Sequence, residues 1–182
     1  MAFNRSCIYY GVVAWLPNVF VERGWTAAAA GSLVAVCNGV GLITTLGVPL
    51  VADRFGGRRR QLVASAIGST AATLAIVVAP AYAFLWVAIL GLGLGSVFPL
   101  VLTLPLDVTD EPRQVGSVAA LMLLGGYTVS ALGPFALGAA RDATGNFEAS
   151  LWILVLVGVA LVGCCLLISP SRLRHGIRRL PA

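Results

Sequence analysis

Lysine is absent from the 182-residue sequence, histidine occurs once, and charged residues of all kinds make up only 10% of the chain. Soluble domains carry about 25% charged residues, because their surfaces must be hydrated. Since 59% of this chain is hydrophobic, it has too few polar groups to cover a water-exposed surface. The scarcity of charge excludes an ordinary soluble fold and predicts an outer surface that faces lipid.

Cysteine is also scarce, and its four positions lie in apolar stretches without the spacing of a disulfide framework or a zinc site. The single histidine, His175, lies in an Arg-rich tail. We therefore expect no metal site and no cofactor. The apolar segments contain no His, Asp or Glu, so a membrane-embedded enzyme lacks the catalytic cluster that it would need, and we expect no enzymatic activity.

What the sequence does contain is a series of long apolar segments. A bilayer core of roughly 30 Å requires about 20 apolar residues per helix, and charged or turn-forming residues divide the chain into six such segments. They cover residues 2–20, 28–51, 62–79, 82–104, 115–139 and 150–168. We expect an all-α membrane protein with a six-transmembrane-helix domain at 1–168 and a cytoplasmic Arg-rich tail at 169–182.

Arginine and tryptophan predict how these spans are oriented. With six spans, every arginine except Arg23 and Arg141 falls on the side that holds both termini. Positively charged residues favour the cytoplasmic side, which places both termini in the cytoplasm of the cell inner (plasma) membrane. The four tryptophans map to the other side, as interfacial residues do: Trp15, Trp25, Trp86 and Trp152. The net charge of +5 is thereby explained without a nucleic-acid partner.

Small residues at four-residue spacing predict where helices approach closely. The second span carries Gly31, Ala35, Gly39 and Gly47 in such a stripe, and the fourth carries Gly91 and Gly95. The fifth span contains Gly133-Pro134, which removes a backbone hydrogen bond and bends the helix. An ordinary packing kink and a flexing point in a moving helix are both consistent with this pair.

Polar residues within the spans are the candidates for binding a solute. An unpaired amide in hydrocarbon costs several kcal/mol, so Asn38 must face another helix, a water-filled cavity or a substrate. Arg5 lies about one turn into the first span, where it either snorkels to the interface or binds an anion. The remaining candidates are Tyr9, Tyr10 and Tyr127.

A short internal echo suits two three-helix units of inverted topology. The second predicted span leads into Ala52-Asp53-Arg54-Phe55-Gly56, and the fifth leads into Ala140-Arg141-Asp142-Ala143-Thr144-Gly145. Each is an Asp/Arg pair followed by glycine, and the predicted topology puts the two on opposite faces of the membrane.

The segment from Gly47 to Arg60, with Asp53-Arg54-Phe55-Gly56 followed by Arg58 and Arg59, resembles the cytoplasmic signature loop of the major facilitator superfamily. That loop joins the second and third helices of each half. Two departures stand out, since Pro49 replaces the usual leading glycine and the Gly56-Gly57 doublet adds a residue.

Two further stretches, Tyr9 to Pro17 and Gly126 to Gly145, are similar to the cyanate/nitroimidazole permease branch of this superfamily. The resemblance implies secondary active transport of a small solute, a small anion among the candidates, by alternating access. It implies that this chain corresponds to the C-terminal half of a twelve-helix transporter.

The expected partners are the lipid bilayer, a small-molecule substrate and an N-terminal six-helix half, in the same full-length chain or as a separate subunit. The chain would otherwise be a truncated gene product or form a homodimer. A six-helix channel or a structural membrane subunit without transport activity is the alternative function. In a transporter, the loop from Asp53 to Arg60 would close the cytoplasmic face during transport.

Overall fold

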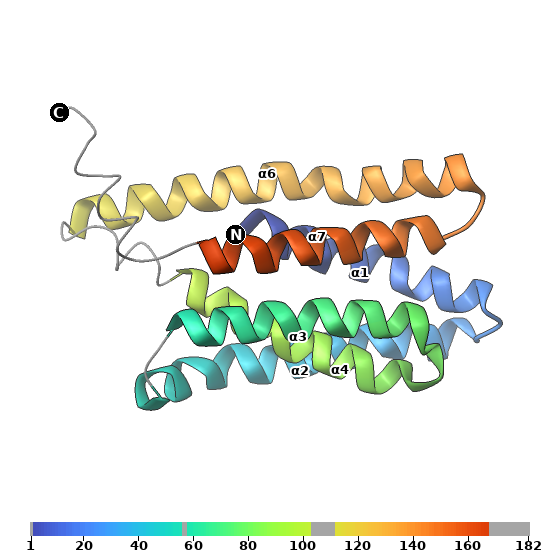
Figure 1. The fold of residues 1–182 in the computed structure, drawn as a ribbon, viewed down its shortest axis with the longest axis horizontal. Helices are drawn as coiled ribbons and strands as arrows, with labels where there is room; N and C mark the ends of the chain where they lie inside the picture. The colour runs from blue at the N-terminus through green and yellow to red at the C-terminus, as the bar shows by residue number, and fades with distance from the viewer. Residues whose placement is uncertain (1, 56–57, 103–111, 168–182) are drawn as a thin grey trace.

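The computed structural model describes residues 2–55, 58–102 and 112–167, and these residues are almost entirely helical. They form six α-helices and one short 3-10 helix (Figure 1). The elements are α1 (Ala2–Glu22), α2 (Ala27–Phe55), α3 (Arg58–Val78), η1 (Pro80–Tyr82), α4 (Ala83–Leu102), α6 (Pro112–Thr144) and α7 (Glu148–Leu167). The predicted all-α fold is confirmed, and each predicted apolar span corresponds to one α-helix.

Several helices extend beyond the apolar spans that predicted them. Helix α2 continues to Phe55, four residues past the predicted end of its span, and α6 continues to Thr144 rather than to residue 139. Charged residues end a stretch that can lie in hydrocarbon, but they do not end a helix, whose backbone hydrogen bonds form equally well at the interface. The connections expected at residues 52–61 and 140–149 are therefore largely helical.

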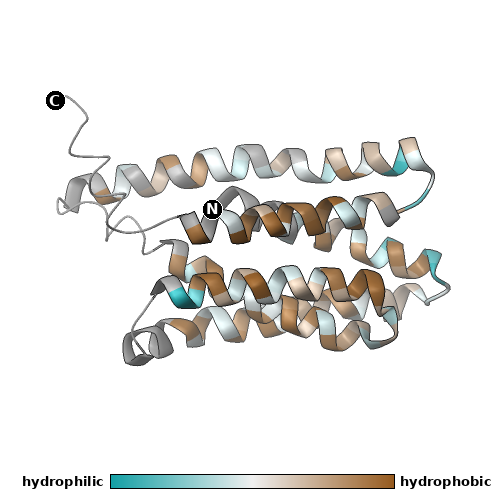
Figure 2. Ribbon diagram, viewed as in Figure 1, coloured by the Kyte–Doolittle hydropathy of each residue, from teal (hydrophilic) through white to brown (hydrophobic). Residues whose placement is uncertain are grey.

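Within the described residues, four helices are long and apolar enough to cross a membrane, judged by length and composition. The stretches are Ala27–Val48, Arg60–Val78, Pro80–Leu100 and Val115–Thr144, and a shorter apolar helix covers Ala149–Gly163. Figure 2 shows hydrophobic residues along the middle of the helices and hydrophilic residues near their ends. The described helices thus suit a multi-pass membrane protein, while the full set of six spans stays a prediction.

Three short connections lie together at one end of the bundle (Figure 1). They join α1 to α2, α3 to α4 and α6 to α7. Gly24 and Gly145 adopt positive φ angles of 88° and 74° in the first and third of them, which glycine permits without a steric penalty. In the second, the Trp86 indole donates a hydrogen bond to the Ala79 carbonyl at 3.0 Å. Two glycines and one indole hydrogen bond therefore stabilise the three turns at this end of the bundle.

The helices pack as two sets that resemble each other. Helix α2 packs mainly on α4, α1 packs mainly on α6, and α3 packs on both α4 and α7. Suppose that α1, α2 and α3 correspond to α4, α6 and α7 in that order. The α2–α4 pair then corresponds to the α6–α1 pair, and the α3–α7 pair corresponds to itself. These three contacts therefore follow the pattern of a twofold exchange between three-helix units, whereas the contact of α3 with α4 is larger than its counterpart between α7 and α1.

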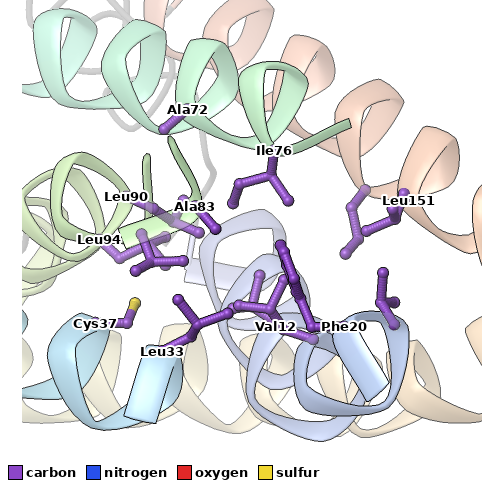
Figure 3. Packing of buried hydrophobic residues seen from close by; sticks show 14 of the residues in the cluster. Val12, Phe20, Leu33, Cys37, Ala72, Ile76, Ala83, Leu90, Leu94 and Leu151 are labelled. Atoms are coloured by element: carbon purple, nitrogen blue, oxygen red, sulfur yellow. The ribbon is translucent and has the colours of Figure 1, made fainter. Parts of the chain in front are cut away.

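The core lies where α1, α2, α3, α4 and α7 converge (Figure 3). Phe20, Leu33, Ile76 and Leu90 are almost fully buried there. Buried hydroxyl groups in the helices bond to backbone carbonyls, as when Ser150 donates to the Leu137 carbonyl at 2.8 Å. The interior is thus apolar with its hydroxyl groups paired, which a bundle in lipid requires.

Candidate functional site

The site begins with an unusually close approach of α2 and α4. A Cβ added at Gly91 would lie 3.2 Å from the Cα of Cys37, and one added at Gly95 would lie 2.9 Å from the Cα of Gly41. Glycine at these two positions of α4 therefore allows the two backbones to touch. The predicted close packing at Gly91 and Gly95 is confirmed.

The glycines of the stripe predicted on α2 make no close contact among the described residues. A Cβ added at Gly31, Gly39 or Gly47 would meet no described atom within 4 Å, so these glycines do not form the contact with α4. The contact uses Cys37 and Gly41 instead, on a different face of the same helix. Small residues occur on more than one face of α2, and their spacing alone does not identify the face that packs.

Beside this contact lies a cavity of about 360 Å³ between α1, α2 and α4. Its lining residues are Tyr9, Cys37, Asn38, Gly41, Leu42, Thr45, Gly91, Leu94 and Gly95. Small-molecule sites have volumes of roughly 300 to 1,000 Å³, so the cavity has room for a small solute. None of these lining side chains is charged, and hydroxyl and amide groups provide its polarity.

Two of the predicted binding residues meet in this cavity. The Tyr9 hydroxyl donates a hydrogen bond to Asn38 Oδ1 at 3.1 Å, joining α1 to α2. Asn38 therefore combines two of the environments that the sequence allowed, because it bonds across helices and also lines a cavity. The Thr45 hydroxyl donates to the Gly95 carbonyl at 3.1 Å and links α2 to α4 in the same way.

The other predicted binding residues lie elsewhere. Tyr10 packs its ring edge against Tyr9, with ring centroids 5.4 Å apart, but it is 39% exposed and does not line the cavity. Tyr127 on α6 is 41% exposed and does not line it either. Arg5 lies in α1, and its side chain is outside the described residues.

Several lining residues were not predicted from the sequence, among them Cys37, Leu42 and Thr45. They lie beside Asn38 or about one and two turns from it, so helical periodicity extended from Asn38 could have found them. Cys37, one of the four cysteines of the apolar stretches, is buried. Leu94 carries no chemical signal that distinguishes it from the many other leucines.

The residues of the predicted loop motif flank the α2–α3 junction. Asp53 and Arg54 belong to the end of α2, and Arg58 and Arg59 begin α3. The side chains of these four residues and the whole of Gly56 lie outside the described residues. The role of this motif therefore stays a prediction.

The Gly133-Pro134 pair lies inside α6, which continues through it. The Trp15 indole N–H of α1 donates to the Pro134 carbonyl at 3.2 Å. The same indole ring lies 3.2 Å from where a Cβ would stand on Gly138. Trp15 therefore braces α6 just beyond the proline.

An ionic contact joins α1 and α6 near the end with the short connections. Arg141 lies 3.6 Å from Glu22 at the end of α1 and 3.6 Å from Asp142. Its guanidinium also covers the Phe147 ring, 5.0 Å from the centroid. Trp15 and Arg141 thus connect α1 to the same half of α6.

Comparison with known proteins relates this chain to a protein family. The sequence profile of the Major Facilitator Superfamily matches residues 1–134. The chain is 31% identical over 157 residues to a cyanate transport protein of Escherichia coli (strain K12), covering 85% of this chain and 41% of that protein. It is 27% identical over 158 residues to a 2-nitroimidazole transporter of the same organism, covering 87% of this chain and 39% of that protein.

A third relative is an uncharacterised transporter of Bacillus subtilis (strain 168), 26% identical over 153 residues, which are 83% of this chain and 38% of that protein. The chain thus spans about two fifths of the length of these curated relatives. The similarity to the cyanate/nitroimidazole branch, inferred from sequence motifs, is confirmed.

Proposed function

This chain belongs to the Major Facilitator Superfamily, and we propose that it forms the C-terminal six-helix half of a secondary active transporter for a small solute. It is a multi-pass membrane protein of a transporter family, not an enzyme. The observation that carries the proposal is the cavity between α1, α2 and α4, where Tyr9 and Asn38 present polar groups between apolar helices. Polar groups placed in this way typically mark solute pathways.

Two observations support the assignment to a half. The α2–α4, α1–α6 and α3–α7 contacts follow a twofold exchange of three-helix units, as expected of inverted repeats. The relatives are more than twice as long as the segment that matches this chain. The proposed partner is an N-terminal half, in the same chain or as a separate subunit, with a second copy of this chain as the other possibility.

The cavity lining favours a small solute with hydrogen-bonding groups over a large apolar one. The described lining has the hydroxyl groups of Tyr9 and Thr45 and the amide of Asn38, but no charged side chain. The names of two relatives specify cyanate and 2-nitroimidazole, which are small and rich in hydrogen-bond acceptors. We propose a substrate of this kind, which includes small anions.

The proposed mechanism is alternating access around this cavity. Trp15 and Arg141 join α1 to α6 at one end of the bundle, which favours movement of this half as one body against its partner. The motif around Asp53 and Arg59 would close the cytoplasmic face, with both termini in the cytoplasm. Tyr10, Tyr127 and Arg5 would contribute to the pathway from positions beside the described cavity.

The decisive experiment is transport by the complete parent protein reconstituted in vesicles. We expect saturable uptake of radiolabelled cyanate or 2-nitroimidazole, with accelerated exchange when unlabelled solute is placed on the other side. Passive flux that does not saturate would favour a channel, and no flux would favour a structural subunit. Sequencing the DNA upstream of the Met1 codon tests the assignment to a half, because it predicts an in-frame segment encoding further spans.

A further inference from the structure

The Tyr9–Asn38 hydrogen bond determines which side of the Asn38 amide faces the cavity. The phenol O–H donates to Oδ1 at 3.1 Å. An amide is planar, with its carbonyl oxygen on one side and an NH2 group with two donors on the other. Because Tyr9 uses one of the two acceptor positions on the oxygen and holds the amide in this orientation, the NH2 group is the part of Asn38 whose hydrogen-bonding capacity is wholly left for a ligand.

The hydroxyl groups of the described lining already donate their protons to other parts of the protein. The Thr45 hydroxyl proton is donated to the Gly95 carbonyl, and the Tyr9 proton is donated to Asn38. Each oxygen can therefore still accept a hydrogen bond, but neither group has a second proton to donate. Among the described lining residues, the Asn38 NH2 group is the strong donor that remains available.

We propose that Tyr9 is a positioning residue that makes Asn38 select solutes by an acceptor group, such as a nitro, carboxylate or cyanate group, and reject solutes that present a donor in its place. This inference rests on the proposed function and adds a rule for substrate choice to it. A solute with a donor at this point would face the NH2 group and leave it without an acceptor. Rejection of this type is an efficient source of specificity.

Because the pair joins α1 to α2 across 29 residues of sequence, the rule depends on the placement of these helices. A shift of α1 along α2 that separates the two groups would free the amide to rotate. The amide could then offer either its oxygen or its NH2 group to the solute, and discrimination would fall. Tyr9 thus acts through Asn38, while the amide itself contacts the solute.

The test compares two probes built on the same ring, 2-nitroimidazole and 2-aminoimidazole, in which a nitro acceptor is exchanged for a smaller amino donor. Competition of each probe with uptake of labelled 2-nitroimidazole into vesicles that hold the complete transporter gives a preference ratio. This ratio does not depend on the amount of active protein. We expect the native transporter to prefer the nitro probe.

Three substitutions sharpen the test. Asn38→Asp keeps the shape and the acceptor for Tyr9 but replaces the NH2 group with a carboxyl oxygen, and the added acceptor and its charge should reverse the preference. Tyr9→Phe should lower the preference about fivefold, the effect of losing one typical hydrogen bond. Tyr82→Phe is the matched control, because Tyr82 is an exposed tyrosine in η1, and it should leave the ratio unchanged.

Each outcome has a distinct meaning. If both Asn38→Asp and Tyr9→Phe transport the probe with the native preference, the selection rule is wrong and the proposed function stands. If Tyr9→Phe changes the uptake rate but not the ratio, Tyr9 has no positioning role and the inference is overturned. If the native transporter neither binds nor takes up either probe, both the proposed substrate class and this rule are contradicted.

Discussion

The α2–α4 and α1–α6 pairs, which a twofold exchange would superpose, use glycine in opposite ways. In α2–α4, Gly91 and Gly95 bring backbone against backbone, and a cavity opens beside the contact. In α1–α6, Gly11 and Gly138 receive side chains, since added Cβ atoms would lie 2.8 Å from Leu137 Cδ1 and 3.2 Å from Trp15 Cζ2. Backbone cannot move aside as side chains can, so the first contact should tolerate much less change.

The contrast suggests a division of roles between the two pairs. Helices α2 and α4 approach closely and form most of the cavity wall, whereas α1 and α6 fill their interface with Trp15 and Leu137 and add the Arg141–Glu22 contact. In the proposed mechanism, the first pair would hold the solute and the second would transmit movement. Substitutions within each pair test this contrast.

The largest effect is expected from Gly95→Ala. The new Cβ would lie 2.9 Å from the Cα of Gly41, and two helix backbones would have to separate. Overpacking of this kind costs about 1 to 3 kcal/mol, and we expect the upper part of that range, measured by unfolding in mixed detergent. The matched control is Gly39→Ala on α2, where an added Cβ meets no described atom within 4 Å and the greater helix propensity of alanine should be neutral or stabilising.

Gly11→Ala should cost less than Gly95→Ala, although its Cβ would lie 2.7 Å from Leu154 Cδ2. The neighbours here are the ends of leucine side chains, which can change rotamer. We expect a loss of about 1 kcal/mol, at the low end of the cost of overpacking, in the same unfolding assay. Equal losses for the two variants would contradict the contrast between backbone and side-chain contacts.

The sequence predicted the helices well because each apolar span lies between charged or turn-forming residues. It predicted Tyr9 and Asn38 as separate candidates, but not as a pair, because the relative position of α1 and α2 depends on packing across the whole bundle. The residues of α2 that contact α4 were not predicted, for a related reason. Gly39 and Gly41 are both small, and only the neighbouring helix distinguishes them.

Trp15→Phe tests the brace between α1 and α6. Phenylalanine keeps an aromatic ring against α6 but loses the indole N–H that donates to the Pro134 carbonyl. We expect a loss of about 1 kcal/mol in unfolding free energy, the value of a typical hydrogen bond, with a larger change in transport rate than in solute affinity. Trp152→Phe is the control, because Trp152 is 46% exposed. Equal effects of the two substitutions on transport rate would show that Trp15 is not a brace.

The smallest effect is expected from Glu22→Gln, which removes the charge that faces Arg141. The two side chains are 45% and 43% exposed and the ions are 3.6 Å apart, so water and salt screen their attraction. Arg141 also keeps its contacts with Asp142 and the Phe147 ring. We therefore expect a loss of no more than about 0.5 kcal/mol, as for other exposed pairs, which disappears at high salt. A loss comparable with that of Trp15→Phe, or one that persists in about 1 M salt, would mean that the ionic contact holds α1 to α6 as firmly as the indole does.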